Sequence, residues 1–264
     1  ILIRAGWPEI AAQGGALLDP MCGSGTILIE AALIAADIAP GLLRGSFGFE
    51  RWLNHRNDIW LGLRDEAFER KKIGLARENL PEIRGYDADV RVIRAAEENI
   101  VSAELDHWLR VSRKELADFV KPTHNKVMEF GLVLSNPPYG ERLGEIESLK
   151  LLYAHLGERL RNEFQGWRAG VFTGNPELGK QMGLRADKKY KFFNGTIASE
   201  LLMFSISSET FVQSRVEQDA RFSKNDAERS EAEQRVKIEN KKEQAAALTN
   251  GAQMLVNRLQ KNLK

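Results

Sequence analysis

The segment from residue 17 to residue 26, LLDPMCGSGT, places an acidic residue and two glycines between an expected strand and an expected helix. Gly23 and Gly25 have no side chain, so the backbone there can approach a bound molecule closely. The dinucleotide fingerprint G-x-G-x-x-G fails because Leu28 occupies the third glycine position, and no lysine follows to make a P-loop. Asp19 ends the strand with a carboxylate, which suits a ligand ammonium group better than a pyrophosphate. The sequence therefore predicts a site for an amino-acid-bearing cofactor, with these loop residues binding it: Asp19, Pro20, Cys22, Gly23, Ser24, Gly25 and Thr26.

A second acidic group follows the second expected strand, in the run Tyr86-Asp87-Ala88-Asp89. An acid at the tip of that strand in an open α/β sheet can accept hydrogen bonds from ribose hydroxyls. We assign this role to Asp87, with Ala88 beside it in the cofactor site. Asp89 is placed to cap the next helix. The alternative interpretation is that both acids serve as caps.

The fourth expected strand ends in Ser135-Asn136-Pro137-Pro138-Tyr139-Gly140. Two prolines after a strand usually mark only a turn, but Asn-Pro-Pro-Tyr at this point is far more specific. Together with the glycine loop and the acid after the second strand, it resembles the class I S-adenosyl-L-methionine-dependent methyltransferases that modify the exocyclic amines of nucleobases. The resemblance covers most of residues 1–207 and implies S-adenosyl-L-methionine as the cofactor.

The resemblance implies catalytic roles for Asn136, Pro137, Pro138 and Tyr139, and it places Asn136 in the cofactor site as well. The Asn136 side-chain oxygen and the Pro137 carbonyl can accept from the amine hydrogens, which directs the nitrogen lone pair at the sulfonium methyl. The prolines fix the loop because their φ angles are locked. Tyr139 offers a ring for stacking the target base, worth ~1–3 kcal/mol, and that base must be unpaired or flipped. No general base is required, Cys22 has no catalytic role, and the four histidines show no metal-ligand spacing.

Strands and helices must alternate along the chain to place these residues at one edge of a sheet. Apolar runs predict seven strands, at 16–19, 83–87, 109–112, 130–135, 167–173, 189–193 and 200–206. Helical patterns cover 25–38, 89–105, 147–164 and 177–182. The alternation predicts an α/β, Rossmann-like class I methyltransferase fold with a mostly parallel sheet and helices on both faces. Because only Asn194-Gly195 and a few residues separate the last two strands, they form a hairpin and the last strand is antiparallel.

A long connection over residues 40–80 has helical character and carries several aromatic and basic residues. Trp52, Trp60, Arg51 and Arg56 belong to it. Long connections in compact domains are often functional, so these residues could contact RNA. Packing of the insert itself is the alternative.

Several further segments, among them FGFERWLNHR, FTGNPELG and KKYKFFNGTIASELLMF, make the resemblance closer. The chain resembles the methyltransferase half of the bacterial 23S ribosomal RNA guanine-N(2) methyltransferase family. This implies N(2)-methylguanosine as the product and 23S ribosomal RNA as the partner. It also implies a THUMP RNA-binding domain before this segment and a second methyltransferase domain behind it. In such enzymes an acid after the third strand commonly lies near the cofactor adenine, and Glu115 is our choice for it.

The composition agrees with one large domain and an appendage. The 264 residues carry 38 Lys and Arg against 37 Asp and Glu. This balance excludes a protein that binds nucleic acid through a surface that is basic all over. We expect a methyltransferase domain over 1–210 that lacks its N-terminal part, a charged linker over 211–250, and the start of a following domain over 251–264. The single cysteine excludes an intrachain disulfide framework and fits a reducing compartment. No apolar run is long enough to span a membrane, and we expect a cytoplasmic protein.

Two other functions compete with the guanine assignment. The Asn-Pro-Pro-Tyr motif alone does not separate it from adenine-N(6) methylation of RNA or DNA. The third possibility is a scaffold that binds the cofactor or RNA without catalysis. The intact motif at Asn136 argues against a scaffold, which has no need of an amine-binding group.

Overall fold

The computed structural model describes residues 1–122, 128–140 and 143–211, and every structural statement below refers to these. In this part of the chain, one sheet has the strand order β3-β2-β1-β4-β5-β7-β6. Its strands are β1 (Ala16–Asp19), β2 (Ile83–Asp87), β3 (Arg110–Arg113), β4 (Gly131–Ser135), β5 (Arg168–Thr173), β6 (Lys188–Asn194) and β7 (Ile197–Ser205). All seven expected strands are present, within a few residues of their predicted bounds.

The first five strands are parallel, and β7 runs antiparallel to both β5 and β6. This confirms the predicted mixed sheet. The reversal occurs at Gly195, whose φ of +61° suits a residue without a side chain. β7 begins at Ile197, earlier than predicted, because its pairing with β6 continues to the turn, where Asn194 lies opposite Ile197.

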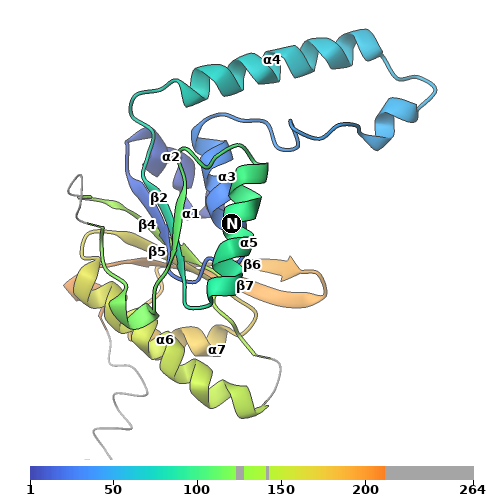
Figure 1. Cartoon of the computed structure of the whole chain (residues 1–264). Coiled ribbons are helices and arrows are strands. Elements are labelled where there is room, and N and C mark those ends of the chain that lie inside the picture. Colours follow the sequence, from blue (N-terminus) through green and yellow to red (C-terminus); the bar gives the residue numbers. More distant parts are fainter. Residues whose placement is uncertain (123–127, 141–142, 212–264) are drawn as a thin grey trace, which may run out of the picture. The chain divides into compact units, whose positions relative to one another are not determined.

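Helices surround the sheet (Figure 1). They are α1 (Leu2–Ala5), α2 (Trp7–Ala12), α3 (Thr26–Ala35), α4 (Asn57–Leu75), α5 (Val90–Ser102), α6 (Leu143–Glu163) and α7 (Pro176–Gly179), with 3-10 turns η1 (Gly48–Arg51), η2 (Leu116–Asp118), η3 (Lys180–Met182) and η4 (Ser208–Thr210). The first two helices were not predicted from the sequence. They pack firmly all the same, since Trp7 is fully buried and its indole N–H donates to the Ala31 carbonyl over 2.8 Å.

Two apolar cores lie on the two faces of the sheet. Leu17 of β1 belongs to the core covered by α1, α2, α3 and α5, whereas the next residue, Leu18, belongs to the core covered by α6 and α7. Side chains alternate between faces along a strand, so β1 must be apolar on both sides. This double burial explains why the parallel strands read as continuous apolar runs.

The insert between α3 and β2 contains α4, which confirms its predicted helical character. The helix joins the domain near its C-terminal end, where Arg70 pairs with Asp37 and Lys71 pairs with Glu104. Gly74 packs against the backbone of α3's C-terminal end, where an added Cβ would overlap a carbonyl. Figure 1 shows the rest of α4 running away from the sheet.

The aromatic residues of the insert divide into packed and exposed ones. The Trp60 ring makes edge contacts with Phe47 and Phe49, at centroid distances of 5.3 and 4.9 Å. Trp52 is 72% exposed. The packing interpretation therefore holds for Trp60, and RNA contact stays a prediction for Trp52.

The predicted linker over 211–250 and the following domain over 251–264 lie outside the described residues, except for Phe211. That residue forms an antiparallel bridge with Leu184 and so belongs to the folded part. No described helix is long and apolar enough to cross a membrane. Among the same residues, no group of three His, Cys, Asp or Glu side chains is arranged to hold a metal ion.

Candidate cofactor and amine site

The glycine loop between β1 and α3 is held against the end of β2 by two hydrogen bonds. The Cys22 N–H donates to the Tyr86 carbonyl over 2.9 Å, and the Gly23 N–H donates to Asp87 Oδ2 over 3.1 Å. The Gly25 N–H closes the turn by donating to the Cys22 carbonyl. The loop and the acid predicted to bind ribose are therefore parts of one structure.

Both glycines of the loop adopt conformations that other residues rarely take. Gly23 has φ of +52°, and Gly25 has φ of +81° at the N-cap of α3. A Cβ at Gly25 would lie 3.3 Å from the Ala96 Cβ of α5. The Asn99 side chain, also on α5, donates to the Ser24 carbonyl over 2.9 Å. The loop is thus clamped by β2 on one side and α5 on the other.

The side chain of Cys22 faces the core and not the site. It is 7% exposed, and burial raises the pKa of its thiol. It packs beside Gly85 of β2, where an added Cβ would lie 2.9 Å from its Sγ and 2.3 Å from a methyl of Leu28. Only the backbone of Cys22 can therefore contribute to a ligand site.

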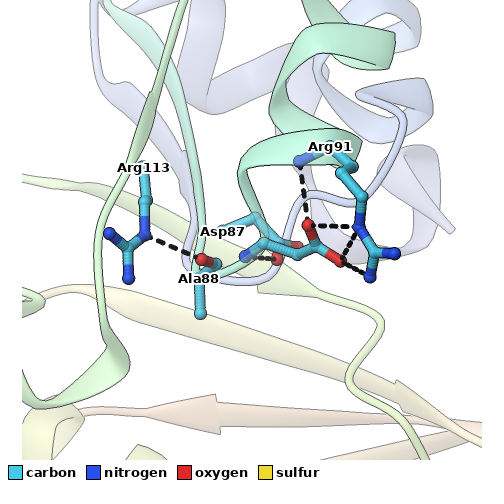
Figure 2. Close-up of polar contacts among 5 residues, drawn as sticks. Asp87, Ala88, Arg91 and Arg113 are labelled. Atoms are coloured by element: carbon cyan, nitrogen blue, oxygen red, sulfur yellow. Dashed lines mark hydrogen bonds and ion pairs between the residues drawn. The ribbon is translucent and has the colours of Figure 1, made fainter.

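Asp87 and Asp89 make different contacts; Figure 2 labels Asp87 and Arg91. The second oxygen of Asp87, Oδ1, accepts the Asp89 N–H over 3.0 Å, so the Asp87 carboxylate connects the loop to the start of α5. Asp89 is the N-cap of α5 and accepts from the Arg91 N–H over 2.8 Å. The guanidinium of Arg91 lowers the pKa of the Asp89 carboxyl to about 2. The cap role predicted for Asp89 is confirmed.

Arg113 joins the ends of β2 and β3. Its Nε donates to the Ala88 carbonyl over 3.0 Å, as Figure 2 shows, and its NH2 group pairs with Glu115 at 3.1 Å. Glu115 thus lies beside the tip of β2, where an adenosine group bound through Asp87 would extend.

Asp19 is buried behind the loop. Its Oδ1 accepts the Met21 N–H over 3.0 Å and the Ser135 hydroxyl over 2.7 Å. Burial raises the pKa of this carboxyl to about 7, although the Ser135 hydrogen bond acts to lower it. Asp19 is 1% exposed, so the structure gives it a role the sequence did not suggest, which is to tie β1 to the residue before Asn136. Direct contact between Asp19 and a ligand ammonium stays a prediction.

The Asn136-Pro137-Pro138-Tyr139 turn presents its polar group to solvent. The Asn136 side chain is exposed and forms no hydrogen bond within the described part of the chain, whereas Pro137 is buried. Tyr139 lies over Gly174, where an added Cβ would be 2.8 Å from its ring. Its hydroxyl is 3.4 Å from the amide nitrogen of Asn194, at the tip of the β6–β7 hairpin. The turn thus leaves an amide free and holds an aromatic ring beside it.

A cleft of about 490 Å³ lies at this edge of the sheet. A volume of this size is typical of small-molecule sites. Seven predicted site residues line it: Pro20, Gly23, Asp87, Ala88, Glu115, Asn136 and Pro138. Seven others are near it but do not line it: Asp19, Cys22, Ser24, Gly25, Thr26, Pro137 and Tyr139.

Four further residues line the cleft and were not predicted from the sequence: Met21, Lys114, Leu116 and Leu152. The Lys114 ammonium lies 4.5 Å from the centroid of the Tyr86 ring. Its position next to Glu115, at the end of β3, is a signal that could have identified it. Leu152 comes from α6, which packs against the same core as Tyr86, and it carries no such signal.

Comparison with known proteins gives consistent results. A family model described as RMKL-like, methyltransferase domain, matches residues 2–202. The chain is 84% identical over 264 residues to the ribosomal RNA large subunit methyltransferase K/L of Cellvibrio japonicus (strain Ueda107), covering all of this chain and 35% of that protein. It therefore spans about a third of the length of the curated relatives that it matches.

Two solved structures share the fold at appreciable identity. One, assigned as a methyltransferase, is complexed with SAH; it is 30% identical, with a TM-score of 0.64, and the match covers 78% of this chain and 56% of that chain. The other is described as a predicted N6-adenine-specific DNA methylase from Listeria monocytogenes str. 4b F2365. It is 34% identical, with a TM-score of 0.61, and the match covers 72% of this chain and 46% of that chain.

Proposed function

The chain belongs to the RMKL-like methyltransferase domain family, and on this basis we propose that it methylates the 2-amino group of a guanine in large-subunit (23S) ribosomal RNA. The observation that carries the proposal is that Gly23, Asp87 and Asn136 line the same cleft. Gly23 belongs to the glycine loop and Asp87 ends β2, whereas Asn136 has a side-chain amide that is free in the described part of the chain.

We propose that S-adenosyl-L-methionine binds in this cleft, whose volume of about 490 Å³ suits a small molecule. When bound, it supplies an electrophilic methyl group on a sulfonium. In this proposal Asp87 would accept from the ribose hydroxyls and Glu115 from the adenine amine, and the backbone at Gly23 would allow close approach of the amino-acid end. The relative complexed with SAH, the demethylated form of this cofactor, supports the same assignment.

The Asn-Pro-Pro-Tyr turn is suited to orient an aromatic amine. Such an amine is a weak nucleophile because its lone pair is conjugated with the ring. The Asn136 Oδ1 and the Pro137 carbonyl can accept its two hydrogens, which favours tetrahedral nitrogen and leaves the lone pair free to attack. Tyr139 can stack on the base while it is held. The catalytic contribution is positioning, and the amine loses its proton after the methyl group has been accepted.

The ribosomal substrate is supported by the K/L relative, whose described activity is on large-subunit ribosomal RNA. We propose 23S ribosomal RNA as the partner and a cytoplasmic site of action. Because the relatives are about three times as long, we also propose that additional domains complete the enzyme. These are the THUMP domain before this segment and a second methyltransferase domain after it.

Adenine-N(6) methylation is the second candidate. It is favoured by the Listeria relative, which is described as a predicted N6-adenine-specific DNA methylase. The same turn at Asn136 could present either amine, so the cleft geometry does not separate the two bases.

The product nucleoside separates these candidates. Unmodified ribosomal RNA is incubated with the full-length protein and methyl-labelled cofactor, digested to nucleosides and examined by mass spectrometry. We expect labelled N(2)-methylguanosine. Labelled N(6)-methyladenosine would overturn the guanine assignment but keep the mechanism. Cofactor binding without any labelled nucleoside would support a catalytically inactive scaffold.

A further inference from the structure

The edge strand β6 carries three exposed lysines without a counter-ion. Lys188, Lys189 and Lys191 form no ion pair within the described part of the chain. Two acids are nearby, since Glu200 lies opposite Lys191 in the β6–β7 register and Asp187 precedes the strand, but neither forms an ion pair with these lysines in the described residues. Three exposed lysines within four residues make this strand a local concentration of positive charge.

Two of these lysines face the same side of the sheet as the amine site. Lys189 lies opposite Leu202, which belongs to the core under α6 and α7, and Tyr139 packs against that same core. Lys191 is two residues further along β6, and side chains two residues apart share a face. The row Lys189, Lys191 and Phe193 therefore follows one face of the strand toward the hairpin tip.

The tip of the hairpin reaches the catalytic turn. Asn194 Nδ2 lies 3.4 Å from the Tyr139 hydroxyl. Phe193, next to it, is 79% exposed. Figure 1 shows the β6–β7 hairpin projecting from the sheet. The lysine row thus ends in an exposed ring at the hairpin tip, and the next residue of that tip, Asn194, contacts the Asn-Pro-Pro-Tyr turn.

We propose that this row, Lys189, Lys191 and Phe193, binds the single-stranded RNA that flanks the target nucleotide. The two ammonium groups would contact its phosphates, and the Phe193 ring would stack on an unpaired base next to the target. A cationic track combined with an aromatic platform is the pattern by which proteins hold single strands without reading their sequence. The inference rests on the proposed function, because it takes the target base to be the one stacked on Tyr139.

A protein strand is a less suitable occupant of this edge. Lysines on an edge strand disfavour the addition of another strand. The free charge is also better matched by a polyanion than by a peptide backbone.

The test uses the full-length protein and two variants, Lys189→Gln/Lys191→Gln and Phe193→Ala. The control, Lys72→Gln/Arg94→Gln, removes two exposed cations from α4 and α5 and changes the net charge equally. The binding of an unmodified ribosomal RNA fragment is measured by fluorescence anisotropy between 50 and 200 mM salt. KM for RNA and the Kd for the cofactor are measured in parallel.

The double lysine variant should raise the Kd for RNA about tenfold. It should also reduce the slope of log K against log salt by about 1.4, since each phosphate contact to a single strand contributes about 0.7. Phe193→Ala should weaken binding about tenfold with no change in the salt slope. The control should leave both quantities near the wild-type values, and all variants should keep the cofactor Kd.

RNA binding and salt slope unchanged in both variants would overturn the inference. So would an equal effect of the control, which would indicate general charge and not a track. RNA binding is measured independently of the methylated product. If the protein methylates adenine, or does not methylate at all, the proposed function fails, but the binding experiment still tests the lysine row.

Discussion

Replacing Ser135 with alanine should weaken the connection between β1 and β4 on which the position of Asn136 depends. The Ser135 hydroxyl donates to Asp19 Oδ1 over 2.7 Å, and both residues are 1% exposed, so water cannot readily take its place. A hydrogen bond to an ionised group contributes about 1.5–3 kcal/mol, whereas one between neutral groups contributes about 1 kcal/mol.

The loss should depend on pH because burial raises the pKa of Asp19 to about 7. At a pH of ~8.5 this carboxyl is mostly ionised, and Ser135→Ala should lower the free energy of unfolding by about 2–3 kcal/mol. At a pH of ~5.5 it is protonated, and the loss should fall to about 1 kcal/mol. Removing the hydroxyl also raises the pKa of Asp19 further, because that hydrogen bond lowers it in the wild type.

Urea denaturation followed by circular dichroism at the two pH values measures this difference. Ser199→Ala is the matched control, since Ser199 is 2% exposed but its hydroxyl donates only to the nearby Ile197 carbonyl, over 3.3 Å. The control should lose less than about 1 kcal/mol, equally at both pH values. A Ser135→Ala loss that is the same at both pH values, or as small as that of the control, would refute the reasoning.

Three other perturbations test separate parts of the site. Asp87→Asn turns one acceptor oxygen into a donor, so the cofactor Kd measured by calorimetry should rise at least about tenfold. The control Asp89→Asn keeps a helix cap and should change that Kd less than about threefold. An unchanged Kd for Asp87→Asn would rule out the ribose role. Raising the pH from about 4 to about 7 should cost up to about 4 kcal/mol of folding stability through Asp19 alone, because its folded pKa of about 7 exceeds the unfolded value of about 3.9 and the folded state holds more protons in that range. Asp19→Asn should remove that part of the pH slope in denaturation experiments, and identical slopes would contradict it. Gly174→Ala would place a Cβ 2.8 Å from the Tyr139 ring, so single-turnover methylation should slow by about tenfold or more at an unchanged cofactor Kd; a normal rate would show that the ring position does not matter.

The strands could be predicted because a strand that is buried on both faces appears in the sequence as a continuous apolar run. β1 and β2 have the predicted bounds. The C-terminal end of the first helix after the glycine loop was predicted less well, since α3 ends at Ala35 and not at residue 38. Asp37 takes a φ of +54° just after it, and neither glycine nor proline marks that turn in the sequence.

The site was predictable as far as it follows the ends of single strands. Asp87 and Asn136 occupy such ends, and the parallel topology brings them to one cleft. Contacts between distant segments could not be predicted in this way. The Ser135 hydrogen bond to Asp19 spans 116 residues, and the Asn194 contact with Tyr139 requires the hairpin to project beyond β5.

The most direct test of the account is whether Asn136→Ala separates methyl transfer from cofactor binding in the full-length protein. Single-turnover transfer to unmodified ribosomal RNA and calorimetric binding of S-adenosyl-L-methionine are measured on the same preparation. We predict that the transfer rate falls on the order of 10²-fold or more, while the cofactor Kd changes less than about threefold. A transfer rate near that of the wild type, or a cofactor affinity that falls in proportion to the rate, would contradict the assignment of Asn136 to the substrate amine.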